Sequence, residues 1–205
     1  MLDSLMRATI PAFILAAGMV LATAAAAQQP PQFIPSRDVT VTYRVPDAGG
    51  DIRMSWLAAS QRMRMDMPQG MGWMVMGPGD ADGFMVMEQQ RMVMALPPGR
   101  GEGRGLMPPA TARFTREGTD RVANLSCTLW RVEDRGEASR ICLTDDGVAL
   151  RAEQIGQPNS RMEATAVTYG PQDPARFERP RGYQSFQMPQ GLGAPGGAIP
   201  PPGLR

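Results

Sequence analysis

The chain has 205 residues, which suits one domain with peripheral segments. All 21 basic residues are arginine and 20 acids nearly balance them, so no strong field points to nucleic acid or to an anionic membrane surface. Lysine and histidine are absent, which excludes Ser-His, Cys-His and Ser-Lys catalytic pairs and zinc sites built on histidine. We therefore predict a protein that is not an enzyme and needs no cofactor.

The N-terminus has the pattern of a targeting segment. Arg7 precedes an apolar run over 8–22, and small residues follow as far as Ala27. This pattern predicts a signal peptide over 1–27, cleaved near Ala27, and a periplasmic location. The apolar run is shorter than the roughly 20 residues of a spanning helix, and no later segment approaches that length, so we expect no transmembrane segment after cleavage. An uncleaved anchor is the alternative.

Short alternating runs separated by turn residues follow a Pro/Gln-rich, flexible lead over 28–37. The runs predict two sets of strands: 39–45, 51–57, 61–67, 71–76, 84–88 and 91–96, then 112–116, 121–132, 139–144, 148–153 and 162–169. No run has the period of a helix. We predict a single antiparallel β domain over 38–185, with a Gly/Pro-rich mobile loop over 97–111 and a disordered tail over 186–205. The Asp145-Asp146-Gly147 sequence predicts a hairpin turn.

Methionine is concentrated in the first set of strands, at alternate positions. Because successive side chains of a strand point to opposite faces, each Met-x-Met pair places both sulfurs on one face. The candidate ligand-binding residues are Met63, Met65, Met74, Met76, Met85, Met87, Met92 and Met94. Pairing of neighbouring runs as hairpins places Met54 opposite Met65, Met65 opposite Met74, Met76 opposite Met85, and Met87 opposite Met92. Val41, Tyr43, Ile52, Met54 and Trp56 extend the same face.

Several roles for this Met-rich face are open. The methionines can be core residues beneath the second set of strands, or they can line a site for a lipid or another apolar ligand, because thioethers adapt to varied shapes. A third possibility is that a partner protein of the cell envelope binds to this face. Cu(I) is a further alternative, since it is a soft ion that thioethers bind. Burial of the strands and the absence of histidine and of a spare cysteine argue against copper.

The reverse face of these strands is apolar as well, with Trp73, Val75, Phe84, Val86 and Val93. If these side chains are exposed together, a protein partner becomes the better explanation than a lipid.

Cys127 and Cys142 are the two cysteines of the chain. Export favours a disulfide between them. Folding the two flanking strands around Asp134-Arg135 pairs Trp130 with Ser139 and places the two cysteines directly opposite each other, within reach of a bridge.

The strand succession resembles that of a known family. The carrying segments are 62–68 (Arg-Met-Arg-Met-Asp-Met-Pro), 72–76 (Gly-Trp-Met-Val-Met) and 91–97 (Arg-Met-Val-Met-Ala-Leu-Pro). They resemble periplasmic outer-membrane lipoprotein carriers of the LolA/LolB-like fold. Segments 122–130, 141–147 and 177–183 are similar to a group of uncharacterised exported bacterial proteins thought to share that fold. The resemblance implies a strongly curved antiparallel sheet, an open half-barrel whose concave face holds acyl chains. The residues of this chain predict few or no helices in that sheet.

These observations together predict a periplasmic, non-catalytic binding protein that holds a lipid or another apolar ligand on a Met-rich concave β face. The alternatives are an envelope interaction or scaffold module with the methionines as core, and Cu(I) binding by the thioethers.

Overall fold

The computed structural model describes residues 30–46, 48–77, 83–96, 108 and 111–186. The predicted signal peptide, most of the predicted loop over 97–111 and nearly all of the predicted tail lie outside these residues. In the described part of the chain, no helix is long and apolar enough to cross a membrane.

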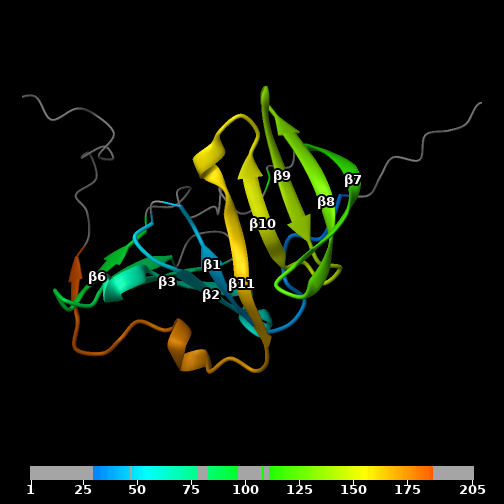
Figure 1. Ribbon diagram of the computed structural model, residues 1–205. Helices are drawn as coiled ribbons and strands as arrows, with labels where there is room; N and C mark the ends of the chain where they lie inside the picture. Colours follow the sequence, from blue (N-terminus) through cyan, green and yellow to red (C-terminus); the bar gives the residue numbers. More distant parts are fainter. Residues whose placement is uncertain (1–29, 47, 78–82, 97–107, 109–110, 187–205) are drawn as a thin grey trace, which may run out of the picture.

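The described residues form one twelve-stranded sheet in the order β12-β6-β5-β4-β3-β2-β1-β11-β10-β9-β8-β7 (Figure 1). The strands are β1 (Val39–Arg44), β2 (Ile52–Leu57), β3 (Arg62–Asp66), β4 (Trp73–Met76), β5 (Phe84–Met87), β6 (Met92–Ala95), β7 (Arg113–Val122), β8 (Leu125–Asp134), β9 (Glu137–Leu143), β10 (Ala149–Gln154), β11 (Met162–Tyr169) and β12 (Gln184–Phe186). Neighbouring strands are antiparallel, except that β12 runs parallel to β6.

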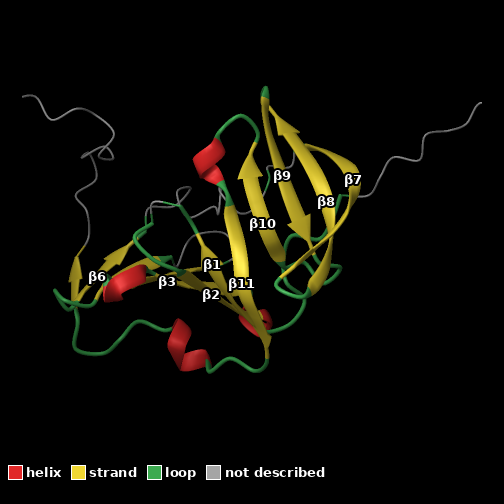
Figure 2. Ribbon diagram, viewed as in Figure 1, coloured by secondary structure: helices red, strands yellow, loops and turns green. Residues whose placement is uncertain are grey.

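Helical structure among the described residues is confined to short 3-10 turns (Figure 2). They are η1 (Ala58–Ser60), η2 (Pro68–Gly70), η3 (Pro158–Ser160) and η4 (Pro174–Phe177). The prediction of a mainly β fold with few or no helices is confirmed.

The sheet consists of two meanders, β1–β6 and β7–β11, joined by the pairing of β1 with β11. Figure 1 shows that β7–β11 rise steeply from the plane of β1–β6. The main core cluster accordingly unites side chains of β1 and β2 with side chains of β8, β9 and β10, strands that are not neighbours in the sheet. Its buried members are Val39, Val41, Tyr43, Met54, Val122, Cys127, Cys142, Val148, Leu150 and Ala164. The predicted open, strongly curved sheet is therefore confirmed, and this cluster lies on its concave side.

The segment over 171–183, which we call the strap, covers the other side of β2–β6. It leaves the end of β11, passes through η4 and reaches β12 at the edge of the sheet (Figure 1). Phe177 is 1% exposed and packs in a cluster with Leu57, Trp73, Val75, Phe84, Val86 and Val93. The guanidinium groups of Arg62 and Arg64 donate hydrogen bonds to the carbonyl oxygens of Phe177 and Arg176, at 3.0 and 2.7 Å. The apolar reverse face is therefore buried by the chain itself.

The predicted strand over 121–132 is wrong as a single element. Ala123 and Asn124 have φ of 48° and 65°, and they form the turn of a hairpin between β7 and β8. Asn tolerates this left-handed conformation better than most residues, which fits its place in a two-residue turn. In contrast, the predicted turn at Asp145-Asp146-Gly147 is confirmed, with Gly147 at φ 91° between β9 and β10.

Candidate functional site

The register of β2–β6 decides whether the methionines share a face. Met54 lies opposite Met65, Met65 opposite Met74, and Met87 opposite Met92, as predicted. The predicted pairing of Met76 with Met85 is wrong, because Met85 lies opposite Met74. The β4–β5 connection is too long to fix the register as a tight turn does, but a shift of two residues keeps every side chain on its face.

The eight candidate methionines form two cross-strand squares. Met63 lies opposite Met76 and Met65 opposite Met74, which makes the β3–β4 square. The β5–β6 square consists of two further directly opposed pairs, Met85 with Met94 and Met87 with Met92. The two squares touch through the Met74–Met85 pair. We call the surface formed by these eight residues the Met face.

The Met face differs in exposure from the reverse face of the same strands. All eight methionines are half-buried, whereas Trp73, Val75, Phe84, Val86 and Val93 are buried. Met63 and Met65 pack against the main core cluster, next to Met54, which is 8% exposed. The other six belong to none of the core clusters of the described residues. Contact with the core cluster thus divides the Met face into an inner part on β3, which packs against the core, and an open part on β4–β6, which does not.

Two features border the Met face. At the sheet edge, Gln184 and Phe186 of β12 lie beside Met92 and Met94 in the parallel pair, and Phe186 is 44% exposed. On β2, Trp56 lies opposite Met63, and its indole Nε1 is buried with no hydrogen-bond acceptor among the described residues.

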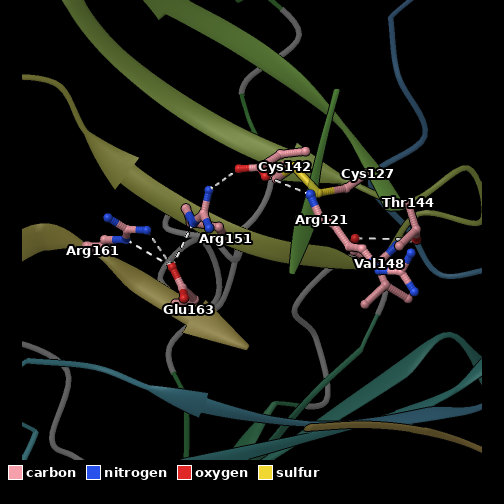
Figure 3. The surroundings of a disulfide bond; sticks show 9 residues. Arg121, Cys127, Cys142, Thr144, Val148, Arg151, Arg161 and Glu163 are labelled. Carbon is pink, nitrogen blue, oxygen red and sulfur yellow. Dashed lines mark hydrogen bonds and ion pairs between the residues drawn. A yellow bond between two sulfur atoms is a disulfide. The ribbon is translucent and has the colours of Figure 1, made fainter. Parts of the chain in front are cut away.

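The predicted disulfide between Cys127 and Cys142 is confirmed, with the two Cα atoms 5.4 Å apart (Figure 3). The predicted register around it is wrong by two residues, because Leu129 lies directly opposite Cys142 and Trp130 opposite Ile141. The turn causes the difference: Asp134 and Glu137 still pair, so only Arg135 and Gly136 remain outside the ladder. The bridge is therefore a diagonal one.

A network of ion pairs crosses β7–β11 near the disulfide (Figure 3). Arg151 pairs with Asp120 and Glu163 at 2.5 and 2.7 Å, and Arg161 pairs with Glu163 at 2.6 Å. The hydrogen bond from Arg151 is the main cause of the lowered pKa of Glu163. The pKa of Asp120 is lowered first by the backbone amide of Arg121 and then by Arg151.

This network borders a cavity of about 360 Å³, lined by Glu117, Asp120, Leu129, Arg140, Arg151, Glu153 and Arg161. Arg140 pairs with Glu117 at 2.6 Å and with Glu153 at 3.1 Å. Each carboxylate of the lining is thus engaged by a guanidinium. We assign the network to the cohesion of the second meander.

Ordinary metal ligands are not clustered in the described part of the chain, where no group of three or more His, Cys, Asp or Glu side chains could hold an ion. Both cysteines of the chain are in the disulfide. The Met thioethers are thus the soft donors that remain.

Sequence reasoning missed the strap and its anchor Phe177. Its local signal is the Asp173-Pro174 pair, in which the Asp173 side chain accepts a hydrogen bond from the amide of Ala175 and caps η4. That signal predicts a turn but not the surface that the turn covers.

Comparisons with known proteins concern the fold. A search among solved structures finds an uncharacterized conserved protein from Thermus thermophilus, with a TM-score of 0.52 and 13% identity over 75% of this chain and 91% of that one. It also finds MucB, at TM-score 0.49 and 17% identity over 74% of this chain and 60% of that one. In the Pseudomonas aeruginosa MucA/MucB complex, the values are 0.49 and 16%, over 74% and 58%. The similarity to the Thermus thermophilus protein shows that the two chains share a fold. No protein-family model and no curated protein matches the chain.

Proposed function

We propose that this protein is a periplasmic, non-catalytic binding protein that holds a lipid chain or another apolar ligand on the open part of its Met face. One observation carries the proposal: six methionines of β4–β6 are only half-buried, while the reverse face of the same strands is covered by the strap. A protein that uses its own chain to bury one apolar face and leaves the other accessible has the second face available for a ligand.

The shape and chemistry of the surface suit an acyl chain. The Met face spans four strands, about 14 Å at the usual strand spacing, on the concave side of the curved sheet. Methionine side chains are unbranched and flexible, so they can follow ligands of different shape. Each buried methylene of a ligand contributes about 0.8 kcal/mol, offset by the ordering of ligand and side chains. We therefore expect modest affinity and tolerance of chain type.

The disulfide supports the proposed location. Disulfides persist in oxidising compartments such as the periplasm, and here both sulfurs belong to the buried core. The resemblance to lipoprotein carriers implies an acyl-binding concave face, and the Met face lies on that side of the sheet.

The test is native mass spectrometry of the full chain isolated from a periplasmic extract, followed by titration with a fluorescent fatty acid. We expect a co-purifying apolar mass and saturable binding of the probe, both lost on Met85→Arg or Met94→Arg. Met71→Arg is the matched control, because Met71 is 50% exposed and lies outside the strands.

A polypeptide without bound apolar mass that also fails to bind the probe would refute the proposal. An equal loss in the Met71→Arg control would show that the effect is not specific to the Met face. A co-purifying polypeptide in place of a lipid would instead favour the envelope interaction module.

A further inference from the structure

We propose that the β5–β6 square is a Cu(I) site, with the thioether sulfurs of Met85, Met87, Met92 and Met94 as ligands. This inference goes beyond the proposed function, because it depends on sulfur lone pairs and not on the apolar surface of the side chains.

The backbone register places the four side chains together. Met85 lies opposite Met94 and Met87 opposite Met92, so they occupy the corners of a rectangle on two neighbouring strands. Directly opposed Cβ atoms are about 4.5–5.5 Å apart, and residues two apart along a strand are separated by about 6.7 Å. Three rotatable bonds in each side chain allow the sulfurs to converge over the centre of this rectangle.

The choice of residue on the two faces of this hairpin supports a role for sulfur. The reverse face has Phe84, Val86 and Val93, three side chains that fill a buried core. The other face has methionine at each of the four alternate positions, although it is only half-buried. Leucine would give similar apolar area, but it has no lone pair to offer a metal. Because these four side chains are only half-buried, the structure answers one of the two objections from the sequence, namely the burial of the strands.

The chemistry of the site selects a soft, monovalent ion. Zn²⁺ takes thiolate, imidazole or carboxylate ligands, and this chain has no histidine and no cysteine outside the disulfide. Cu(I) accepts thioethers. Among the described residues, those directly opposite the square on the flanking strands β4 and β12 are Met74, Gln184 and Phe186, which carry no formal charge. These neutral side chains provide no negative charge to balance a bound ion. The cost of removing the ion from water is lower for one positive charge than for two, which favours a monovalent ion.

The β3–β4 square is the internal comparison. It has the same pattern of opposed Met pairs, but Met63 and Met65 pack against the main core cluster. Their sulfurs are therefore held by packing, and we expect no Cu(I) site there.

The experiment is an anaerobic titration of the full chain with Cu(I) in competition with bicinchoninate. Ascorbate serves as the reductant, because a thiol would attack the disulfide. The test variant is Met92→Leu with Met94→Leu, and the control is Met63→Leu with Met65→Leu. Both exchanges nearly conserve volume, so both variants should fold, which a urea unfolding curve verifies.

We expect a single Cu(I) per chain, an X-ray absorption spectrum with a sulfur-only shell, and no binding of Zn²⁺. The β6 variant should lose competition with the chelator at least tenfold, and the β3 variant should retain it. Failure of the native chain to compete would overturn the site, and so would unchanged binding in the β6 variant or equal loss in the β3 variant.

The fluorescent fatty acid separates this site from the proposed function. The probe is titrated onto the native chain without added copper, so that the two results are read separately. A native chain that binds copper but not the probe refutes only the proposed function, and one that binds the probe but no copper refutes only the copper site.

Discussion

The strap gives the strongest prediction on stability, through Phe177. Its side chain is 1% exposed and fills the cluster between the strap and β2–β6. Truncation of a buried Phe to Ala removes the apolar contacts and leaves a cavity, which costs about 3–5 kcal/mol. Since domains of this kind are stable by about 5–15 kcal/mol, Phe177→Ala should remove a large share of the free energy of unfolding.

Phe186→Ala is the matched control, because Phe186 belongs to the same C-terminal segment but is 44% exposed on β12. We expect it to cost less than about 1 kcal/mol. Urea unfolding followed by tryptophan fluorescence is the assay. Trp73 lies in the strap cluster, with its ring centroid 5.6 Å from that of Phe84. With a slope of about 2 kcal/mol per molar urea, Phe177→Ala should lower the midpoint by about 2 M.

Similar small shifts in both variants would refute the reasoning, because they would mean that the strap adds little to the core. A large loss in Phe186→Ala alone would place the anchor of the C-terminal segment on β12 instead.

Three further predictions follow from particular contacts. Replacement of Cys127 and Cys142 by Ala should lower the free energy of unfolding by about 2–4 kcal/mol, measured in urea. Gly72→Ala should lower the thermal midpoint and cost at least about 1–3 kcal/mol, because Gly72 has φ 145° and a Cβ there would collide with a backbone carbonyl of β5. The pKa of the Glu88 carboxyl lies below its usual 4.5, first because the Tyr183 hydroxyl donates a hydrogen bond to it. The stabilising contribution of Glu88 should therefore be complete above pH 4.5 and fall as the pH drops through the lowered pKa. The free energy of unfolding of Glu88→Gln, measured at a series of pH values, should lack this pH dependence. The same pH dependence in the native chain and in the variant would contradict the assignment.

The faces of the strands were predictable because the period of two survives errors of register. The turn between Met87 and Met92 is short enough to fix their pairing, and the sequence predicts that pairing correctly. The connection between Met76 and Phe84 is longer, so the predicted register slipped by two residues while the methionines kept their common face.

Local signals failed where a turn has no glycine or proline. Ala123-Asn124 closes the β7–β8 hairpin with two residues of positive φ, and alanine gives no indication of such a turn. The strap was missed for a different reason. Phe177 has no periodic apolar neighbours in the sequence, and its partners are on strands about 80–120 residues earlier in the chain.

Exposure of the Met face could not be read from the sequence because it depends on the curvature of the sheet. The bend brings β8–β10 over β1 and β2, so that Met54 becomes core, but it leaves Met85 and Met94 beyond the covered region. The same set of methionines therefore includes one buried core residue, Met54, and side chains that are only half-buried.

The seam between β1 and β11 has a consequence for how the chain folds. Every other antiparallel pair in the sheet joins strands that are consecutive in the sequence, whereas this pair joins residues such as Val39 and Tyr169. Hairpins form quickly, because their strands are close in the sequence. Pairing of distant strands is slower, because the entropy of closing a long loop is lost before the new contacts stabilise the structure. Each meander can thus assemble early by itself. The rate of folding should then be set by the docking of one meander on the other along the β1–β11 pair, where the register also shifts between Thr42 and Tyr43. Amide hydrogen exchange along β1 and β11 would then report the late step, while β8 and β9, linked by the disulfide, would be protected first.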